Sequence, residues 1–595
     1  MNLELVLRSK IEEAVLSLFG QPASNIQLQP TNQEFEGSHT VVCFPLTKLS
    51  RKSPEETAKV LGEHLLSNSQ LVSKYNVVKG FLNLVIHDDI WVKVFASIYD
   101  NKQFGQLPGN GKEIMVEYSS PNTNKPLHLG HLRNNFLGYS VAEILKANGN
   151  KVHKVQIIND RGIHICKSMA AWKLFGNGET PESSGIKGDH LVGKYYVIFD
   201  KTYKGEISTL VNSGMPPEQA EKEAPIMRLA VELLQKWEQH DPETYQLWQT
   251  MNSWVYDGFN ATYERMGVDF DKLYYESETY LLGKEEVLKG VDSGVFFKKL
   301  DGSVWVDLTS DGLDQKVLLR ADGTSVYMTQ DIGTAILRFR DFPNITGQVY
   351  TVGNEQEYHF KVLFLILGKL GYEWADKCYH LSYGMVDLPS GKMKSREGTV
   401  VDADDLIREM VEEAEKQTRE LGKLEDVTET DAQRLFGTIG LGALKFFLLK
   451  VDPKKRMLFD PNESIQLQGF TGPFIQYTHA RIRAIIRKAD SLAIEVRKED
   501  LENVKALEPA EREILQVLSL FEIRIADAAK EYSPAVIANY AFDVAKQYNQ
   551  FYQSIPIFNE EDQAKLRFRI ALSTTVAHVL KKSMGLLGIS VPEKM

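Results

Sequence analysis

The sequence contains little cysteine, only three residues among 595. Cys43, Cys166 and Cys378 lie far apart, which fits neither a disulfide framework nor the paired spacing of a zinc site. A long hydrophobic run is also missing. The longest, residues 362–367, is far shorter than the ~20 residues that span a bilayer, and charges interrupt the apolar residues at the amino terminus. We therefore expect no membrane association, no structural metal and a cytoplasmic location.

An excess of positive charge is absent too. Asp and Glu number 80 against 69 Lys and Arg, a net charge of −11, so the surface is not one that holds any nucleic acid indiscriminately. An RNA partner would need local basic faces. The chain also lacks the motifs G-x-x-x-x-G-K-[ST], H-E-x-x-H and G-x-S-x-G, which argues against P-loop proteins, zinc proteases and α/β-hydrolases.

What is present indicates a multidomain globular protein of α/β plus all-α class, with 43% hydrophobic residues. Residues 1–110 are predicted to form a small α+β domain, and residues 111–401 an α/β domain with a helical insertion at about 165–310. A helical connecting segment, 402–455, and a separate helical bundle, 456–595, are predicted to follow. Long amphipathic helical stretches are expected at 404–420, 464–490, 509–530 and 534–553.

The α/β domain begins with a strand–loop–helix–strand unit. A short apolar strand at 114–118 leads through a polar loop to a helical pattern from Gly130, which ends near Gly149. Another strand is predicted at 152–158, and the α/β pattern is expected to resume at 304–308. Such a βαβ crossover predicts a parallel sheet.

The loop of this unit carries the most informative motif, H-x-G-H. His128 and His131 stand three apart at the start of a helix, so their rings project from one face. The helix amino terminus favours a phosphate there, and Gly130 leaves room for a nucleotide against the backbone. Two capping or core histidines are the alternative. The position after the first strand of a βαβ unit favours nucleotide binding.

A second basic segment, residues 388–398, lies in a glycine-bounded loop. Lys392, Lys394 and Arg396 are flexible cations that could reach a polyphosphate. Taken alone, the loop is better explained as a solvated surface loop. Together with H-x-G-H, polyphosphate binding becomes the better interpretation.

These two motifs together resemble the signature pair of the class I aminoacyl-tRNA synthetases, H-x-G-H followed by a K-M-S-K-like loop. The flanking residues resemble the arginyl-tRNA synthetase branch. The matching segments are Glu117-Tyr-Ser-Ser-Pro-Asn, Asp322-Gly-Thr-Ser-Val-Tyr-Met-Thr-Gln-Asp331, Gly472-Pro-Phe-Ile-Gln-Tyr-x-His-Ala-Arg481, Gly588-Ile-Ser-Val-Pro-Glu-Lys-Met595, Phe44-Pro-Leu-x-Lys48 and Gly80-Phe-Leu-Asn83. The resemblance therefore covers the whole chain.

The resemblance implies a Rossmann-type catalytic domain, an added amino-terminal domain and a helical anticodon-binding bundle. It also implies an ATP-dependent ligase, acting as a monomer, that activates L-arginine as arginyl-adenylate and transfers it to the 3′ end of tRNA(Arg). ATP would bring Mg²⁺, although the sequence shows no dedicated cage for a metal.

The resemblance also assigns site residues. Catalysis falls to Lys125, His128, His131 and Lys392, and ATP binding to His128, Gly130, His131, Lys392, Met393, Lys394 and Ser395. Arginine would be held by Glu117, Asn122, Tyr327, Asp331 and Gln356. A guanidinium is a planar cation best held by carboxylates and flat partners, so the acids would take that end and Asn122 the α-amino end. Taken alone, Asp331 is also explained as a helix N-cap.

Two segments depart from the family pattern. Ser395 stands where K-M-S-K has its last lysine, and we expect Lys125, just upstream of H-x-G-H, to supply the missing charge. Asn159-Asp-Arg-Gly-Ile-His164 stands where the family commonly has Gly-Asp-Trp-Gly-x-Gln. No binding role is therefore assigned to Arg161 or His164.

The tRNA is expected to contact a basic helix at 477–488. Arg481 and Lys488 share one face of it, and Arg483 and Arg487 another, while Tyr477 could stack on a base. A solvated bundle helix is an equally good explanation for any one of these residues. Later aromatic and amide residues, Tyr540, Tyr548, Asn549 and Tyr552, are expected to be mostly core, with one or two of them facing an anticodon base. By resemblance, Asn83 of the first domain would face the tRNA elbow.

Three other functions remain open from the sequence. One is a class I synthetase for another amino acid, which would not need Glu117 and Asp331. A small-molecule nucleotidyltransferase shares H-x-G-H but not the second loop and the helical bundle. A catalytically silent tRNA-binding paralogue is expected to lose the site histidines, which are present here.

Overall fold

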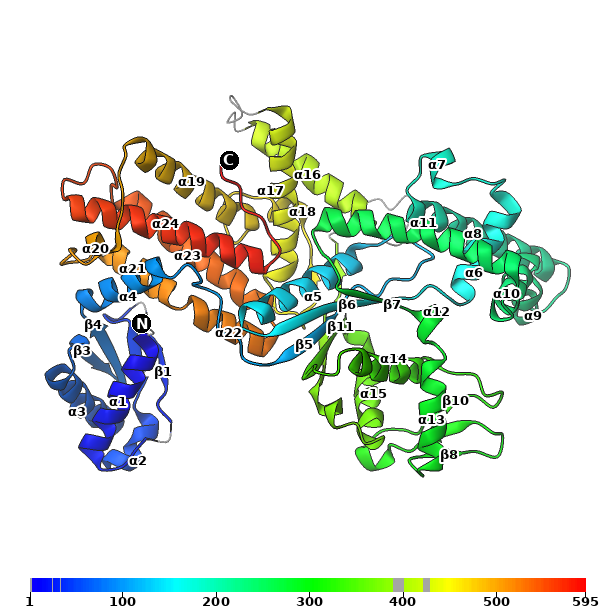
Figure 1. Ribbon diagram of the computed structural model, residues 1–595, viewed down its shortest axis with the longest axis horizontal. Helices are drawn as coiled ribbons and strands as arrows, with labels where there is room; N and C mark the ends of the chain where they lie inside the picture. Colours follow the sequence, from blue (N-terminus) through cyan, green and yellow to red (C-terminus); the bar gives the residue numbers. More distant parts are fainter. Residues whose placement is uncertain (1–2, 24, 33, 389–400, 421–427) are drawn as a thin grey trace.

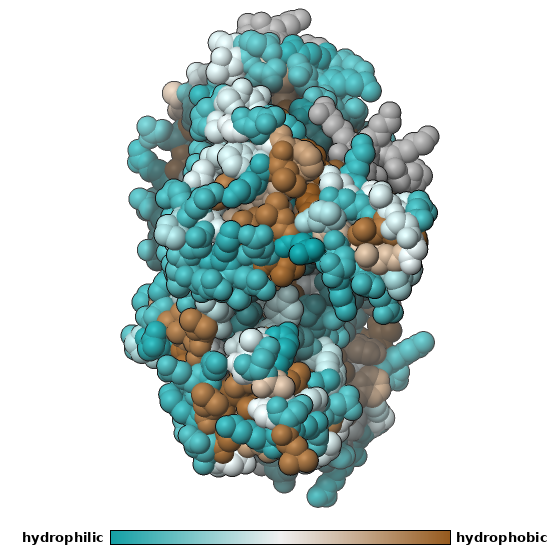
Figure 2. Space-filling view, turned by 90° about the vertical axis from the view of Figure 1, so that its right-hand side faces the viewer, coloured by the Kyte–Doolittle hydropathy of each residue, from teal (hydrophilic) through white to brown (hydrophobic). Residues whose placement is uncertain are grey.

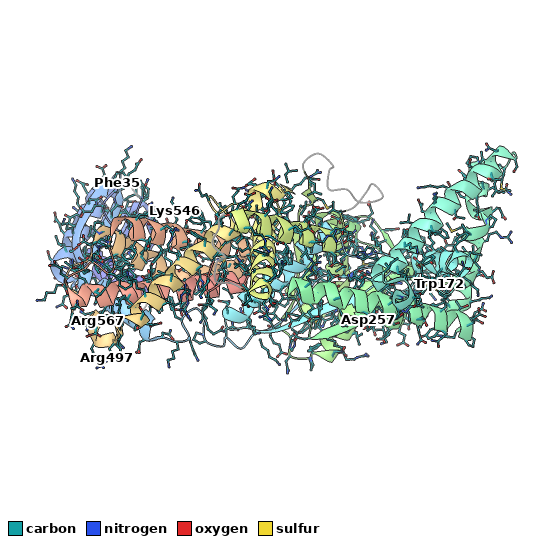
Figure 3. All side chains as sticks on the ribbon, turned by 90° about the horizontal axis from the view of Figure 1, so that it is seen from above. Phe35, Trp172, Asp257, Arg497, Lys546 and Arg567 are labelled. Atoms are coloured by element: carbon teal, nitrogen blue, oxygen red, sulfur yellow. The ribbon has the colours of Figure 1, made fainter. Side chains whose placement is uncertain are left out.

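The protein, seen here as a computed structural model, is described for residues 3–595 except 24, 33, 389–400 and 421–427. It is elongated, with the amino-terminal domain and the helical bundle at one end (Figure 1). Seen from above, Phe35 and Lys546 lie toward that end, and Trp172 and Asp257 toward the other (Figure 3). A central sheet joins the two ends.

The amino-terminal domain is an antiparallel sheet of order β1-β2-β4-β3 packed against helices. Its elements are α1 (Leu3–Phe19), β1 (Leu28–Pro30), β2 (His39–Val42), α2 (Thr47–Ser50), α3 (Pro54–Asn68), β3 (Val72–Val78) and β4 (Phe81–Ile86). The helix α3 starts where it does because Ser53 and Glu56 form a reciprocal capping box. The helix α4 (Asp88–Asp100) then leads toward the central α/β domain.

The central sheet is parallel, of order β12-β11-β5-β6-β7, and confirms the α/β prediction. Its elements are β5 (Glu113–Glu117), α5 (Leu129–Ala147), β6 (Lys151–Ile158), β7 (Lys272–Tyr275), α14 (Tyr327–Asp341), β11 (Gly347–Gly353), α15 (Glu357–Lys369) and β12 (Cys378–Tyr383). The helix α5 packs on the face that carries Tyr118, whose ring leaves no space for a Cβ at Gly138. Met115 and Tyr274 belong to the opposite face, where Leu337 and Phe339 of α14 cover them.

Two segments of this domain differ from the prediction. The expected insertion at 165–310 contains β7, which pairs with β6 in the central sheet, so the helical insertion ends earlier. Its helices are α6 (Ile163–Phe175), α7 (Pro181–Ser184), α8 (Gly188–Asn212), α9 (Pro217–Glu223), α10 (Pro225–Glu238) and α11 (Pro242–Met266). The expected strand at 304–308 is β9 of a small antiparallel sheet rather than part of the parallel one. That subdomain contains α12 (Glu276–Thr279), α13 (Leu282–Asp292), β8 (Phe296–Lys298), β9 (Val304–Val306) and β10 (Lys316–Leu319).

The carboxyl-terminal part is helical, as predicted. Its helices are α16 (Ala403–Glu420), α17 (Glu429–Leu449), α18 (Pro461–Ser464), α19 (Gly472–Ser491), α20 (Lys498–Leu501), α21 (Pro509–Ser519), α22 (Phe521–Glu531), α23 (Pro534–Ser554) and α24 (Gln563–Leu586). One short strand among them, β14 (Met457–Leu458), pairs with β13 (Val386–Asp387), which precedes this part of the chain. The stretch expected at 464–490 starts later, because the Thr471 hydroxyl caps α19 by accepting from the Phe474 N–H. The stretch expected at 509–530 is divided at Leu520 into two helices.

One described helix, α17, has the length and hydropathy of a membrane span, but 67% of its apolar window is buried within the protein. Burial of that kind is typical of a core helix. The surface at the end opposite the bundle is mostly hydrophilic, with apolar patches over both the helical insertion above and the small-sheet subdomain below (Figure 2). The fold thus places the central sheet between a helical insertion and a helical bundle.

Candidate active site

The order of the central sheet indicates where a ligand binds. The chain leaves β5 toward β6 and β7 on one side, and returns to β11 and β12 on the other. In open α/β sheets, ligands bind beyond the carboxyl ends of the strands where the strand order reverses. Here that point lies between β5 and β11. The H-x-G-H loop follows β5, and Gln356 follows β11.

The loop after β5 is held in an unusual backbone conformation. Ser119 and Ser120 have φ values of 78° and 47°, a region that residues other than glycine rarely adopt. The Asn134 side chain of α5 fixes this turn, because its Oδ1 accepts from the Ser119 N–H (2.6 Å) and its Nδ2 donates to the Thr351 carbonyl (2.7 Å). Asn134 was not predicted, although a polar Asn-Asn pair on an otherwise apolar helix is a signal for it. Asn134 joins the H-x-G-H helix to both strands at the reversal point.

The two histidines of H-x-G-H both cap the helix and present donors. His128 Nδ1 accepts from the Gly130 N–H, and His131 Nδ1 accepts from the His128 N–H, each at 3.1 Å. In the neutral ring the proton therefore lies on Nε2. The ring centroids are only 3.9 Å apart. The capping alternative is correct for Nδ1, but it leaves two Nε2–H donors at the positive end of α5.

Burial keeps both rings neutral. Burial, with a smaller contribution from Lys125, lowers the pKa of His128 to about 4. Burial lowers the pKa of His131 well below its ordinary value, helped by His128 and Lys125. Neutral rings with fixed Nε2 protons can donate hydrogen bonds to phosphate oxygens without changing protonation state near neutral pH. Gly130 suits this arrangement, because a Cβ there would lie 3.0 Å from His128 Cε1 and would push the ring aside.

The segment that follows the second basic loop lies directly on H-x-G-H. The Leu129 N–H donates to the Val401 carbonyl and the Ala403 N–H to the Leu127 carbonyl, each at 3.0 Å. Lys392, Met393, Lys394 and Ser395 themselves lie outside the described residues. This backbone pairing joins Val401 and Ala403 to the residues on either side of His128.

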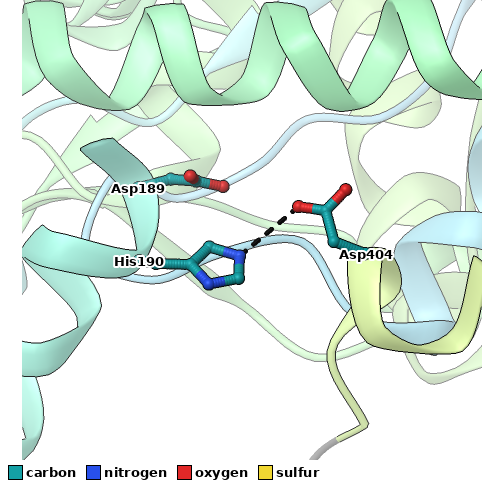
Figure 4. A group of neighbouring side chains, drawn as sticks. All are labelled: Asp189, His190 and Asp404. Atoms are coloured by element: carbon teal, nitrogen blue, oxygen red, sulfur yellow. Dashed lines mark ion pairs between the residues drawn. The ribbon is translucent and has the colours of Figure 1, made fainter. Parts of the chain in front are cut away.

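A charged cluster ties the start of α16 to the helical insertion. Lys187 Nζ lies 2.6 Å from Asp404 and 3.1 Å from the fully buried Asp189, and His190 forms a 3.4 Å ion pair with Asp404 (Figure 4). Burial would raise the pKa of Asp404, but His190 and Lys187 together hold it below its usual range. Asp189, His190 and Asp404 are close enough to be metal ligands. The Lys187 ammonium already provides a cation between the two carboxylates, so this cluster is explained as a structural link.

Glu117, the first predicted arginine ligand, closes β5 and is buried. One carboxylate oxygen accepts from the Ser120 hydroxyl (3.1 Å), and the other forms an ion pair with Arg338 of α14. The pairing of Glu117 with Arg338 was not predicted, because the two residues lie more than 200 positions apart in the sequence.

The remaining arginine ligands come from three elements. Tyr327 begins α14 and Asp331 lies one turn later, so Asp331 is inside the helix and the N-cap alternative is wrong. His359 Nε2 lies 2.6 Å from Asp331 Oδ2, which joins the start of α14 to the start of α15, just after Gln356. Asn122 is exposed, and its backbone forms an isolated parallel β-bridge with that of Asn159, just after β6. No contact between these ligands themselves is seen within the described part of the chain.

A further acidic residue missed from the sequence is Glu276, which follows β7. Burial raises the pKa of Glu276 to about 7, with Arg161 opposing and Asp160 and Asp331 adding to the rise. Its place at the carboxyl end of a sheet strand was hidden, because β7 itself was not predicted.

The segment that departs from the family pattern contacts the helical insertion. Asp160 is buried and accepts from the Tyr256 hydroxyl (2.9 Å) and the Ser277 hydroxyl (2.7 Å). The Arg161 guanidinium lies 3.8 Å from the Tyr280 ring centroid, and His164 Nδ1 lies 3.3 Å from the Tyr196 hydroxyl. These contacts account for Asp160, Arg161 and His164 as structural residues.

The predicted tRNA residues of the bundle form a cluster between α19 and α23. The Arg481 guanidinium lies 4.8 Å from the Tyr477 ring centroid and 5.4 Å from that of Tyr552, and it donates to Asn549. This cluster presents a cation between two aromatic rings. Tyr540 and Tyr548 are buried core residues, as expected.

The second basic face of α19 has a structural partner instead. Arg483 forms an ion pair with Glu593, and Arg487 donates to the Glu593 carbonyl (2.8 Å). Both arginines thus hold the carboxyl-terminal segment.

Asn83 of the amino-terminal domain is buried as well. It stands in register with Thr40 and Asn76, and its amide bonds to their side chains at 2.6 and 2.7 Å. This polar ladder across three strands uses the Asn83 side chain within the sheet. A direct contact of that side chain with tRNA therefore has no support in its position.

Comparisons with known proteins agree over the whole chain. Residues 93–460 match the family model "tRNA synthetases class I (R), catalytic domain", residues 475–595 the DALR anticodon binding domain, and residues 5–86 the arginyl tRNA synthetase N terminal domain. The chain is 55% identical to the arginine–tRNA ligases of Amoebophilus asiaticus and Bacteroides fragilis, in each case over 100% of both chains. Its fold is similar to that of Thermus thermophilus arginyl-tRNA synthetase, with TM-score 0.80, 24% identity and 99% of each chain covered. A Plasmodium falciparum arginyl-tRNA synthetase gives TM-score 0.78 at 18% identity, over 100% of this chain and 99% of that one.

Proposed function

Because the chain belongs to the arginyl-tRNA synthetase family, we propose how its own residues carry out the two steps of that family's reaction. The activity is that of an arginine–tRNA ligase of class I. The arginine carboxylate attacks the α-phosphate of ATP, giving arginyl-adenylate and pyrophosphate. The arginyl group then passes to the terminal ribose of tRNA(Arg), and AMP leaves. A match of this kind over the full length disfavours a nucleotidyltransferase, a synthetase for another amino acid and a silent paralogue.

The proposal for ATP rests on one observation, the paired Nε2–H donors at the start of α5. His128 and His131 would donate to the phosphate oxygens, where negative charge gathers in the transition state. The amino terminus of α5 adds its positive end, and Gly130 would lie along the adenosine side. Lys392 would neutralise negative charge on the leaving pyrophosphate. Met393, Lys394 and Ser395 would complete that loop. Mg²⁺ would arrive with ATP and bind its phosphates.

The proposal for arginine divides its two ends among the ligands at the strand-order reversal. Glu117 and Asp331 would hold the guanidinium, with Tyr327 as the flat partner. Asn122 and Gln356 would hold the amino-acid end. The support is positional: the loop after β5, the loop after β11 and the start of α14 all lie around the carboxyl ends of neighbouring strands.

Arginine-dependent ATP–pyrophosphate exchange tests the proposed activity directly. We expect exchange with arginine and not with lysine or citrulline, because only a guanidinium cation presents both the positive charge and the planar donors that two carboxylates require. The assay is run with and without cognate tRNA, which shows whether RNA completes the site. If neither condition supports exchange while the protein still binds tRNA, the assignment as an active ligase is wrong.

Replacement of Lys125 by alanine is expected to lower the rate of adenylate formation about 10- to 100-fold, less than the ~10²- to 10³-fold for a fully desolvated donor, because water screens part of a half-buried charge. Lys125 is half-buried and close enough to lower the pKa of both site histidines. Lys112, exposed just before β5, provides the matched control. Single-turnover adenylation measures the rate. If Lys125→Ala retains the wild-type rate, Lys125 does not replace the missing lysine of the K-M-S-K-like loop.

For tRNA, we propose that Tyr477 and Arg481, with Tyr552, contact an anticodon base. A cation held between two rings suits stacking on an unpaired base. The proposed domains are those predicted from the sequence, with the amino-terminal domain near the tRNA elbow. We further propose a monomer working in the cytoplasm without a membrane. The residues proposed for both substrates belong to one chain, and all three cysteines are free and buried.

A further inference from the structure

Arg338 is a buried arginine next to the proposed binding site for the substrate arginine. Its side chain is 1% exposed and forms an ion pair with Glu117, which is 7% exposed. The guanidinium lies 5.2 Å from the Tyr274 ring centroid and 5.7 Å from that of Tyr350. Its Nε and Nη2 atoms are buried without a hydrogen-bond partner in the described part of the chain. Glu117 is thus its ion-pair partner, and the guanidinium does not serve a larger hydrogen-bond network.

The pair is arranged so that Glu117 faces in two directions. One carboxylate oxygen meets Arg338, and the other accepts from Ser120 in the strained loop after β5. Burial alone would lower the pKa of Arg338, but Glu117, Tyr350 and Tyr274 more than offset burial and raise it. Arg338 is therefore a fixed positive charge. A buried carboxylate without such a partner would instead favour its protonated, neutral form.

Asp331 and Arg338 stand on one face of α14. They are seven residues apart, which is close to two helical turns, so their side chains project in nearly the same direction. Arg338 is positively charged, whereas Glu117 and Asp331 are both negatively charged, with Asp331 at the far end. Burial mainly raises the pKa of Tyr350, and Glu117 and Asp331 both add to the rise, so the two carboxylates lie in one region, which suits a cation. Without Arg338, two carboxylates would face a substrate that carries a single guanidinium.

We propose that Arg338 is a positioning residue of the arginine site, which keeps Glu117 ionised and holds its second oxygen toward the substrate guanidinium. This inference rests on the proposed role of Glu117 as an arginine ligand. Arg338 acts through Glu117 and does not itself contact the substrate. With Arg338 present, Arg338, Glu117 and Asp331 together carry a net charge of −1, which matches one substrate guanidinium. Arg338 therefore contributes to selection against neutral analogues such as citrulline.

The test is direct binding of L-arginine to the full-length protein by calorimetry, at several pH values between 6 and 9. For Arg338→Met we expect the Kd at pH 7 to rise roughly 30- to 100-fold, the lower end of the effect of removing one partner of a buried charge pair. Relative to wild type, the affinity of this variant should recover as pH rises, because hydroxide restores the Glu117 carboxylate. Tyr274, Tyr350, Cys378 and Asp331 are the other titratable groups near the pair, and all of them are present in both proteins.

Three further variants separate positioning from folding. Arg338→Lys keeps the charge and should bind arginine within about 10-fold of wild type, without the recovery at high pH. Glu117→Gln should bind weakly at every pH. Arg569→Met breaks another buried ion pair, with Glu511 in the helical bundle (2.7 Å), and should lower thermal stability without changing the Kd for arginine.

The outcomes distinguish the two proposals. If Glu117→Gln binds arginine as wild type does, Glu117 is not a ligand and the proposed function of that residue fails. If Glu117→Gln binds weakly but Arg338→Met keeps wild-type affinity, the positioning role alone is overturned. Weak binding by Arg338→Met that does not recover with pH would mean a structural role only, and would also overturn it.

Discussion

Replacement of His128 by asparagine is expected to lower the kcat for ATP–pyrophosphate exchange about 10²- to 10³-fold, the usual effect of removing one donor that stabilises developing charge. Asparagine is chosen because it is itself a good N-cap, so the start of α5 should stay intact. What the variant loses is the Nε2–H donor. The KM for ATP should change much less than kcat if the donor acts mainly on the transition state.

A matched control for this variant is His87→Asn. His87 is the N-cap residue of α4, exposed and without a side-chain cap bond, so its replacement should leave exchange unchanged. The pH profile gives a second check. Because burial lowers the pKa of His128 to about 4, kcat/KM for ATP should show no histidine step between pH 6 and 8. A step near pH 6.5 that disappears in His128→Asn would contradict a neutral donor.

Short motifs could predict how the H-x-G-H residues are arranged because their geometry is local. His128, Gly130 and His131 lie within four residues, and their mutual hydrogen bonds follow once α5 starts at Leu129. The spacing of four between Tyr327 and Asp331 was likewise sufficient, since α14 begins at Tyr327. In both cases helical periodicity alone decides which side chains share a face.

Long-range contacts could not be predicted in this way. The partner of Glu117 lies on α14, and the partner of Asp331 lies on α15, so both depend on how helices pack around the sheet. The strand β7 was missed because four residues, Lys272–Tyr275, carry too short a pattern to outweigh the helices before them. Asn83 lies on β4, and its burial depends on polar partners from two neighbouring strands.

Replacement of Asp331 by asparagine is expected to raise the KM for arginine about 10²-fold, which is toward the lower end for loss of a charge partner. The lower end applies because the Asp331 side chain is 42% exposed, so water screens part of its interaction with the substrate. Asparagine has nearly the same shape and can still accept from His359. The variant therefore removes the charge while the contact between α14 and α15 remains.

The same helix provides a control in Asp341→Asn. Asp341 is near the other end of α14, where it pairs with Lys272 (2.6 Å), and its replacement should leave the KM for arginine unchanged. Steady-state aminoacylation with arginine and citrulline as competitors measures both variants. Asp331→Asn should also reduce the ratio by which the enzyme prefers arginine over citrulline, because a neutral side chain no longer attracts the positive charge of arginine. If its KM and preference match wild type, the guanidinium does not bind at Asp331, and Glu117 and the half-buried Glu276 become the acidic groups that must account for selectivity.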